Sequence, residues 1–184
     1  MARLLPHFVI AASHVNKTVI HYDTLRRQSI KGLKGNFYVA FCSLMTFYPE
    51  FRNLFYYRIG QLSKVISFLC PAMNTLFIYT PKIGEGLFIQ HGFATIISAE
   101  SIGKNCWINQ QVTIGYSNDT DCPTIQDNVF IYAGAKIIGK VNIGSNSKVG
   151  ANSVFIKSVP ENCTVVGVPA KIVRKDGHKI TAEL

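Results

Sequence analysis

The sequence has few charged residues and no long uninterrupted apolar run. Charged side chains make up only 16% of the 184 residues, below the usual quarter, so much of the surface is expected to be covered by other parts of the protein or by other subunits. No segment reaches the ~18 apolar residues of a membrane-spanning helix. With 48% hydrophobic residues, the composition excludes disorder and predicts one domain, or one domain with a helical annex.

Paired cysteines are also absent. The five cysteines are Cys42, Cys70, Cys106, Cys122 and Cys163, and no Cys-x-x-Cys pair occurs. An odd number at irregular spacing is typical of reduced thiols and gives no zinc pattern. The stretch 4–13 resembles a weak signal peptide, but Pro6 and His7 interrupt it. We therefore expect a cytoplasmic protein without a bound metal, and its position at the inner face of the membrane stays open.

Acidic residues are scarce in the first part of the chain. Residues 1–75 contain nine basic and two acidic residues, whereas residues 76–184 contain ten and eight. A basic field suits an anionic substrate, a phospholipid surface or nucleic acid, although a solvated basic face explains it equally well. Because no nucleic-acid-binding motif accompanies the charge, we do not expect nucleic acid as a partner. The basic, aromatic N-terminal region is a candidate for peripheral membrane association.

The apolar pattern before residue 75 has the period of a helix. Phe37, Ala40, Phe41 and Leu44 fall at helical spacing. Pro49 and Glu50 suit the first turn of a further helix, whose apolar stripe continues to Leu69. The sequence therefore predicts a small α-helical region over residues 1–75. The stripe is interpreted as a packing face, with a membrane-surface helix as the alternative.

After residue 80 the apolar residues recur every six positions. The predicted anchors are Ile83, Ile89, Ile96, Ile102, Ile108, Ile114, Ile125, Ile131, Ile137, Ile143, Val149 and Phe155. A period of six fits a short strand plus a corner, and three such units close a triangular coil of about 18 residues. Stacked coils pair as parallel strands about 4.8 Å apart. Twelve anchors predict about four coils; turn signals come too often for a β-sandwich.

Two irregularities interrupt the repeat. One is a slip of one residue around positions 95–99, and the other is the insertion GYSNDTDCPT at positions 115–124. A loop expelled from a solenoid usually lines its binding face. We predict a helical region over 1–75 and a β domain over 76–184, with a protruding loop at 115–124 and a C-terminal tail at 159–184 that leaves the repeat.

The block from Ile83 to Val173 resembles the hexapeptide-repeat acyltransferases, and within them the serine acetyltransferase branch. The strings IGEGLFIQHGFATII, INQQVTIG, VFIYAGAKIIGKVNIGSNSKVGANSVF and VPENCTVVGVPAKIV carry this resemblance. The segment YPEFRNLFYYRIG is similar to the helical part of serine-acetyltransferase-like proteins of capsule and exopolysaccharide pathways. The resemblance implies a mainly β fold, a left-handed parallel β-helix, in exception to the usual right-handed crossover. It also implies acetyl-CoA as co-substrate and a homotrimer with active sites between subunits.

His91 matches the family's catalytic histidine in the string HGFATII. An imidazole, with an ordinary pKa of about 6.5, can take a proton from an acceptor hydroxyl and return it to the leaving thiolate. The hydroxyl then attacks the thioester directly, and backbone N–H groups hold the oxyanion. The family's orienting acid aligns with Leu76, and the acid beside the histidine is replaced by Gln90. Glu100 or a backbone carbonyl is the candidate to orient the ring, unless Glu100 is a solvated corner residue.

The family's serine-recognition residues are missing. Its loop carries an arginine–histidine pair before a proline, whereas this chain has Asp121 and Cys122 before Pro123. Without the bidentate clamp for a carboxylate, the loop argues against a small zwitterion and favours a saccharide hydroxyl. The candidate substrate-binding residues are Trp107, Tyr116, Asp121 and Cys122; Trp107, Tyr116 and Tyr132 offer flat faces for a sugar ring. Trp107 packing at a subunit interface is the alternative.

For the co-substrate, the resemblance implies a groove in which backbone hydrogen bonds hold the pantetheine arm. Ala133 and Ala151 match the family's groove positions, and Gly134 and Gly150 flank them. Lys171 and Arg174 are candidates for the phosphates of CoA. The alternative is that these alanines merely fit a narrow prism.

Together these observations predict an acetyl-CoA-dependent O-acetyltransferase that acts on a saccharide or saccharide precursor. One alternative is a serine O-acetyltransferase of cysteine biosynthesis. Another is a catalytically silent trimeric binding or scaffold protein. A γ-type carbonic anhydrase needs three histidines on zinc, and the repeats contain only His91.

Overall fold

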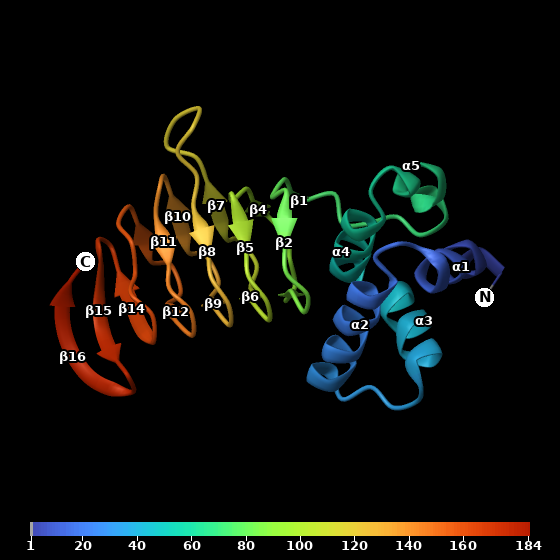
Figure 1. Cartoon of the computed structure of the whole chain (residues 1–184), viewed down its shortest axis with the longest axis horizontal. Coiled ribbons are helices and arrows are strands. Elements are labelled where there is room, and N and C mark those ends of the chain that lie inside the picture. Colours follow the sequence, from blue (N-terminus) through green and yellow to red (C-terminus); the bar gives the residue numbers. More distant parts are fainter. Residues whose placement is uncertain (1) are drawn as a thin grey trace. The chain divides into compact units, whose positions relative to one another are not determined.

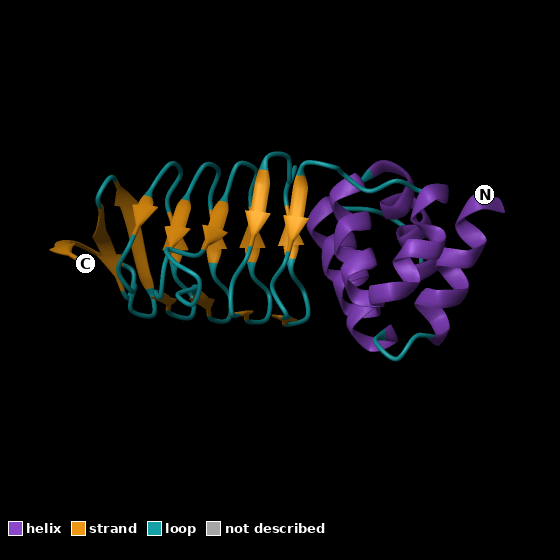
Figure 2. Ribbon diagram, turned by 90° about the horizontal axis from the view of Figure 1, so that it is seen from above, coloured by secondary structure: helices purple, strands orange, loops and turns teal. Residues whose placement is uncertain are grey.

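The computed structural model describes residues 2–184, and the chain divides into a helical unit that ends at Asn74 and a β unit from Thr75 to Leu184. Figure 1 labels the helices of the first unit and the strands of the second. Figure 2 shows that the β unit is a stack of short strands joined by corner loops. The expected fold class, mainly β with a parallel β-helix after N-terminal helices, is confirmed.

The helical unit packs around an aromatic core. Its helices are α1 (Leu5–Ser13), α2 (Lys17–Lys31), α3 (Phe37–Phe47), α4 (Pro49–Ile59) and α5 (Ser63–Ile66), with 3-10 turns at Ala2–Leu4, Gly60–Leu62 and Ser67–Leu69. Phe41, Phe51 and Phe55 are buried at its centre. The apolar stripe expected to run unbroken to Leu69 is interrupted at Gly60, whose φ of 56° ends α4 because glycine tolerates left-handed backbone without a steric penalty.

Both acidic residues of the helical unit are buried in ion pairs. Asp23 Oδ2 on α2 lies 2.8 Å from Nε of Arg58 on α4, and Glu50 pairs with Arg27. Burial lowers the pKa of the Arg27 guanidinium to about 10, and the attraction of Glu50 opposes that shift. The remaining basic side chains of residues 2–74 therefore have no exposed acid beside them on this unit.

Three parallel sheets form the faces of the β unit. Sheet A contains β1 (Leu76–Ile78), β4 (Thr95–Ile97), β7 (Thr113–Gly115), β10 (Lys136–Ile138) and β13 (Val154–Phe155). Sheet B contains β2 (Lys82–Ile83), β5 (Ser101–Ile102), β8 (Thr124–Ile125) and β11 (Asn142–Ile143). Sheet C contains β3 (Phe88–Ile89), β6 (Trp107–Ile108), β9 (Phe130–Ile131), β12 (Lys148–Val149) and β14 (Cys163–Gly167), followed by the antiparallel strands β15 (Ala170–Lys175) and β16 (His178–Glu183). Successive strands belong to different sheets, so each set of three makes one coil.

The solenoid has about five coils, where the anchors predicted about four. The first coil begins earlier, because β1 pairs in parallel with β4. The last coil extends later, because Val159 bridges to Ile143 and β14 pairs in parallel with β12. The chain therefore leaves the solenoid at the turn after β14 and not at residue 159. Val159 and Val165 still point inward and are buried, which keeps this segment in the stack.

One predicted anchor faces outward. Ile97 is completely buried, whereas Ile96 is 40% exposed. The reason is a longer corner before β4: Ile89 and Ile97 are eight positions apart, and the equivalent pair Ile108 and Ile114 are six apart. The predicted slip near residue 95 is thus a two-residue insertion before the strand.

Asparagines form a column at the corner between sheets B and C. Asn105, Asn128, Asn146 and Asn162 all have left-handed backbone, with φ between 55° and 63°. Asn128 Nδ2 donates to Asn146 Oδ1 at 3.1 Å, and Asn146 Nδ2 donates to Asn162 Oδ1 at 3.0 Å. Asparagine tolerates this conformation better than most residues, and the ladder of amides fixes one coil on the next.

No helix within residues 2–184 combines the length and apolar character needed to cross a bilayer. The five cysteines have free thiols. Across the same residues no group of three His, Cys, Asp or Glu side chains is placed to hold a metal ion.

The buried Arg27–Glu50 pair generates a stability prediction. Glu50→Gln should lower the free energy of unfolding by about 3–5 kcal/mol, because it leaves the arginine charge buried without its partner. Urea titration followed by circular dichroism measures the change. The matched control is Glu85→Gln, which removes one partner of the partly exposed Lys104–Glu85 pair (3.2 Å) and should cost less than about 1 kcal/mol. Equal losses in the two variants would contradict the prediction.

His7 is a buried titratable group that lies against the Tyr56 hydroxyl. Its Nε2 lies 2.9 Å from the Tyr56 hydroxyl oxygen, and that hydroxyl donates to the Cys70 carbonyl at 2.6 Å. The Tyr56 hydroxyl thus links the His7 ring to the Cys70 carbonyl. Burial is the main cause that lowers the pKa of His7 from its ordinary value.

A lowered native pKa makes the helical unit sensitive to acid. The unfolded chain binds a proton at His7 more readily than the folded chain, so the stability contributed by neutral His7 is present above the unfolded pKa of about 6.5 and is lost as the pH falls. We expect the Tm to fall more between about pH 7.5 and about pH 5.5 in the wild type than in His7→Gln. The control His21→Gln, at an exposed ring, should follow the wild type. A slope unchanged in His7→Gln would refute the assignment.

Candidate active site

His91 lies on the lengthened corner between β3 and β4. His91 and Gly92 both have left-handed backbone, with φ of 64° and 68°, and the Gly92 N–H donates to the Gln90 carbonyl at 2.8 Å. Left-handed backbone also occurs at regular corners of this edge, at Gln111 and Asn152, so it is typical of these tight turns. The two inserted residues bulge out of the regular corner, so the imidazole is exposed at the edge where sheet C meets sheet A.

The ring of His91 has little support within one chain. Among residues 2–184 its one polar contact is with Gln90, whose Nε2 lies 3.5 Å from Nε2 of the ring. At the position of the family's orienting acid, Leu76 is buried in β1. An apolar side chain in that place cannot accept a hydrogen bond from the imidazole. That Leu76 replaces the family's orienting acid stays a prediction.

Glu100 does not meet His91 within one chain. Its carboxylate accepts a hydrogen bond from the Thr124 hydroxyl at 3.3 Å, and its backbone N–H donates to the Pro123 carbonyl at 2.8 Å. Strand β4 separates Glu100 from His91, so the two residues occupy different edges of the prism. Within one chain Glu100 thus makes no contact with the ring, and the prediction that it orients His91 stays a prediction.

The residues predicted to hold the co-substrate lie on the same edge as His91. Ala133 and Gly134 form the corner between β9 and β10, and Gly150 and Ala151 form the corner between β12 and β13. The Asn152 N–H donates to the Ala133 carbonyl at 2.9 Å, which holds these two corners in register. At about 4.8 Å per coil, the two corners lie about 10 and 14 Å along the axis from His91. The edge thus carries an exposed base and, farther along, backbone with small side chains.

The two glycines of this edge also have packing roles. Gly134 has a φ of 75°. A Cβ on Gly150 would lie 2.6 Å from Cγ1 of Val166. Close packing of the coils therefore accounts for both glycines without a ligand. The two alanines are more accessible: Ala133 is half-buried, and Ala151 is exposed at its corner.

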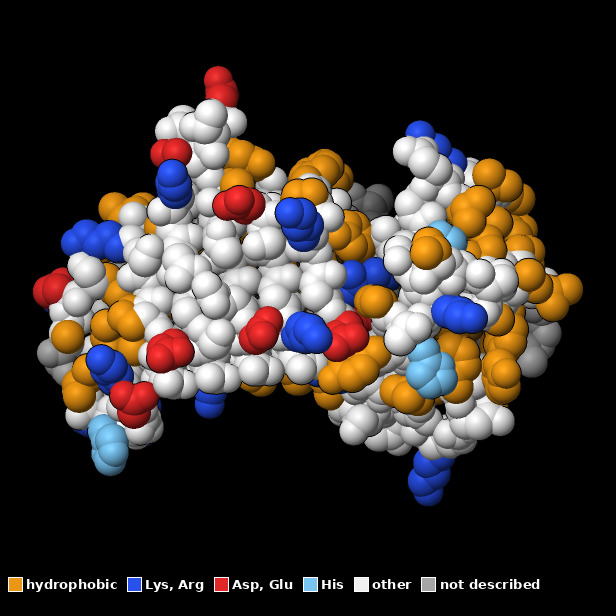
Figure 3. All heavy atoms as spheres, in the orientation of Figure 1, with side chains coloured by type: hydrophobic (Ala, Val, Ile, Leu, Met, Phe, Trp, Pro, Cys, Tyr) orange, Lys and Arg blue, Asp and Glu red, His pale blue; other side chains and the backbone are white. Residues whose placement is uncertain are grey.

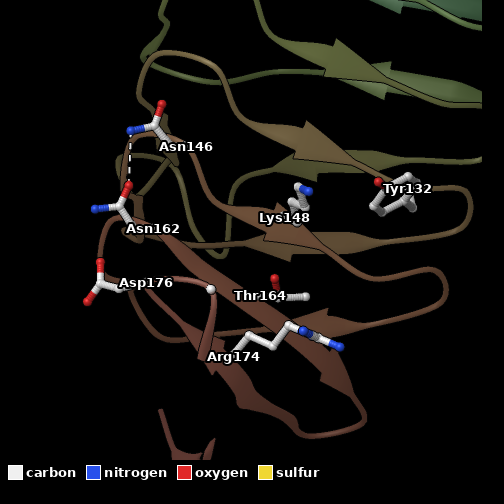
Figure 4. Close-up of a pocket in the computed structure, with 8 residues that line it drawn as sticks. Tyr132, Asn146, Lys148, Asn162, Thr164, Arg174 and Asp176 are labelled. Carbon is white, nitrogen blue, oxygen red and sulfur yellow. Dashed lines mark hydrogen bonds between the residues drawn. The ribbon is translucent and has the colours of Figure 1, made fainter. Parts of the chain in front are cut away.

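A basic hollow of about 800 Å³ opens on the outer face of sheet C beside this edge. It is lined by Tyr132, Asn146, Lys148, Asn162, Thr164, Arg174, Asp176 and Gly177. Figure 4 shows Lys148, Thr164 and Arg174 on neighbouring strands, with Tyr132 at one border and the asparagine ladder at the other. Two cations outnumber the one carboxylate, that of Asp176, and together with hydroxyl and amide groups they suit phosphate oxygens.

Only one of the two predicted phosphate ligands lines the hollow. Arg174 lines it, whereas Lys171 is ion-paired with Glu183, with Nζ 2.7 Å from Oε1. Sequence reasoning missed Lys148. Its position directly before the buried anchor Val149 was a usable signal, because neighbours of an inward residue on a strand point outward.

The protruding loop gathers the other predicted residues at a different edge. It connects β7 to β8 and extends from the solenoid as the yellow segment of Figure 1. Within it, Asn118 Oδ1 accepts from the N–H of Thr120 and Asp121, and Asn118 Nδ2 donates to Asp121 Oδ2 at 2.9 Å. The Asp121 carboxylate is therefore held by its own loop.

Tyr116 and Cys122 meet at the base of this loop. A hydrogen bond with Cys122 is the main cause that raises the pKa of Tyr116, and the electrostatic effect of the Cys122 sulfur acts in the same direction. Glu100 lies near enough to the Tyr116 hydroxyl to raise its pKa further. Glu100, Tyr116, Asp121 and Cys122 thus come together where sheets A and B meet, away from the edge that carries His91.

Trp107 is not available as a platform for a sugar ring. Its ring centroid lies 4.2 Å from that of Phe88 and 5.6 Å from that of Phe130, and these residues occupy the preceding and following coils. Its Nε1–H donates to Asn109 Oδ1 at 2.7 Å. The predicted stacking role is therefore wrong, because aromatic neighbours lie on both sides of the indole. Tyr116 and Tyr132 remain exposed.

The sequence is similar to known transferases. The family model described as bacterial transferase hexapeptide (six repeats) matches residues 122–157. A serine acetyltransferase of Synechococcus elongatus is 33% identical over 147 residues, which are 72% of this chain and 60% of that protein. A serine acetyltransferase of Staphylococcus aureus (strain Mu50) is 47% identical over 103 residues, which are 54% of this chain and 48% of that protein. The chain thus spans about half the length of these curated relatives.

Solved structures agree with the sequence matches. A serine acetyltransferase in complex with CoA has a TM-score of 0.72 and 25% identity, over 91% of this chain and 73% of that one. The hexapeptide model, the sequence relatives and the solved structure therefore converge on one group of proteins. The chain belongs to the hexapeptide-repeat transferase family, and the relatives and the solved structure that it matches are serine acetyltransferases.

Proposed function

We propose that this protein is an acetyl-CoA-dependent O-acetyltransferase with His91 as its general base. The observation that carries the proposal is the shared edge: His91 is exposed on a lengthened corner, and the corners of Ala133 and Ala151 continue the same edge toward the basic hollow. The CoA complex of a structural neighbour supports acetyl-CoA as co-substrate. Lys148 and Arg174 supply cations for its phosphates.

The reaction follows from an exposed imidazole next to a bound thioester. A ring nitrogen of His91 takes the proton of the acceptor hydroxyl, while the hydroxyl oxygen attacks the thioester carbonyl carbon. Collapse of the tetrahedral intermediate breaks the C–S bond, and the imidazolium returns the proton to the CoA thiolate. The products are an O-acetyl ester and free CoA, and no covalent enzyme intermediate is required.

A homotrimer would complete the site. Within one chain the loop residues and His91 occupy different edges of the prism, but a closed three-fold ring places different edges of neighbouring copies together. Exposed apolar side chains on the outer side of sheet A support such packing: Phe77, Tyr79 and Ile96 are 40–67% exposed. In this assembly Glu100 and Asp121 of one subunit approach His91 of the next.

We propose L-serine as the acceptor, since the relatives are serine acetyltransferases. These comparisons favour what was the alternative, and they give no support to a polysaccharide pathway. One observation keeps a saccharide hydroxyl as the second candidate. Asp121 stands where the family's loop has an arginine, and an acid there repels the carboxylate that arginine would bind.

The prediction for His91 is tested by release of free CoA thiol from acetyl-CoA. His91→Ala should lower kcat about 10²–10⁴-fold, because the proton-transfer catalyst is lost. The control His178→Ala changes a histidine of β16, outside the proposed site, and should keep wild-type turnover. Unchanged turnover in His91→Ala would overturn the assignment of the base.

The same assay discriminates the acceptors. L-Serine is compared with a panel of sugars and nucleotide sugars at equal concentration. Turnover with serine that depends on His91 supports the proposal. Turnover with a sugar alone, again dependent on His91, replaces serine by the second candidate. No turnover with any acceptor would favour a silent scaffold, provided that equilibrium dialysis also shows no acetyl-CoA binding.

The basic hollow gives a separate prediction. Lys148→Ala and Arg174→Ala should each raise the KM for acetyl-CoA about tenfold with little effect on kcat, since a lost charged hydrogen bond to phosphate weakens ground-state and transition-state binding equally. Lys82→Ala, which removes an exposed lysine from sheet B, is the matched control. Wild-type KM in both hollow variants would place the phosphates elsewhere.

A further inference from the structure

The first helix of the chain has apolar side chains on its outer as well as its inner face. α1 contains no charged residue. Leu4, His7 and Ala11 are buried on one side, while Leu5 and Val9, one turn apart, are 66% and 56% exposed. A helix that is apolar all round is normally covered on both sides. The outer side of α1 therefore requires a partner that the helical unit itself does not supply.

α3 extends the same apolar surface. It too has no charged residue among its eleven. The Phe8 ring of α1 stacks on the Tyr38 ring of α3, with centroids 5.0 Å apart, so the exposed sides of the two helices adjoin. We call this surface the α1–α3 face; it consists of Leu5, Phe8, Val9, Ala12, Tyr38 and Val39. Figure 3 shows apolar side chains gathered broadly over the helical unit.

Basic side chains border the α1–α3 face. Arg3 lies two residues before the start of α1, and Lys34 lies three residues before the start of α3; both are exposed. Lys17 lines a hollow of about 500 Å³ together with Ala12, Phe37 and Tyr38. The two acidic residues of this unit are buried in ion pairs with Arg58 and Arg27. The border of the face therefore carries positive charge that no exposed acid of the unit offsets.

We propose that the α1–α3 face binds the surface of an anionic lipid bilayer. A short apolar helix flanked by cations is suited to lie in the plane of the headgroups, with its aliphatic side chains below them and its cations at the phosphates. A second copy of this chain fits less well, because two faces brought together would oppose their basic borders. The proposal does not depend on the acetyltransferase activity.

Vesicle binding of the full chain tests this proposal. The probes are vesicles of phosphatidylcholine alone and vesicles with about one third phosphatidylglycerol. We expect at least tenfold stronger binding to the anionic vesicles, and a loss of about tenfold when salt is raised from about 0.1 M to about 0.5 M. Equal binding to both compositions, or no binding to either, would overturn the proposal.

Two sets of variants separate the apolar and the charged contributions. Leu5→Ser combined with Val9→Ser should lower binding to the anionic vesicles at least about tenfold. Lys17→Glu combined with Lys34→Glu should abolish the preference for anionic lipid. The matched controls in the β unit are Ile156→Ser, at a residue 72% exposed, and Lys82→Glu, and both should bind as the wild type does. Circular dichroism confirms that each variant folds.

The oligomeric state decides against the competing occupant. Light scattering is measured on the wild type and on the Leu5→Ser, Val9→Ser variant without vesicles. We expect the same mass for both. A larger assembly that the double substitution dissociates, with vesicle binding unchanged, would assign the face to a second copy and refute the proposal.

Discussion

The hydrogen-bonded stacking of one coil on the next governs every feature of the β unit. Each short strand pairs with the strand one coil away, and the aliphatic anchors fill the interior between the three sheets. Because the pairing is in parallel and in register, residues at equivalent positions form straight columns along the axis. The asparagine ladder and the aromatic column that contains Trp107 are both consequences of this constraint.

The proposed chemistry resides where the constraint is relaxed. A regular corner uses its backbone groups to join the coils and holds its side chains close to the prism. The two extra residues between Ile89 and Ile97 free one corner from this pattern and expose His91. The long loop after β7 does the same at another edge and brings Tyr116, Asp121 and Cys122 together with Glu100. Insertions therefore add function without disturbing the inward anchors.

In the helical unit, the acidic residues lie in the interior, and the charges at the surface are basic. Its two acids are buried in ion pairs between α2 and α4: Asp23 with Arg58, and Glu50 with Arg27. These ion pairs hold α2 against α4. Such pairs stabilise little compared with apolar packing, but they penalise any arrangement that separates the partners. The surface is left with basic and apolar side chains, a combination that suits an anionic interface and that composition alone indicated only as a net charge.

The sequence by itself determined the period of six, the loop at 115–124, the histidine on the solenoid and the family, because each anchor fixes the inward direction of its own short strand. It also singled out Ala133 and Ala151, which lie at corners of the same edge as His91, and Arg174, which lines the hollow. Only the tertiary structure decided that Ile97 and not Ile96 faces inward, and that a fifth coil exists. It also showed that Lys148 and not Lys171 lines the hollow, and that Glu100 is separated from His91 within one chain. Trp107, finally, lies between two aromatic rings. These facts depend on the alignment of residues one coil apart, and a local pattern does not contain it: corner lengths vary, and hydrogen bonds between coils set the register.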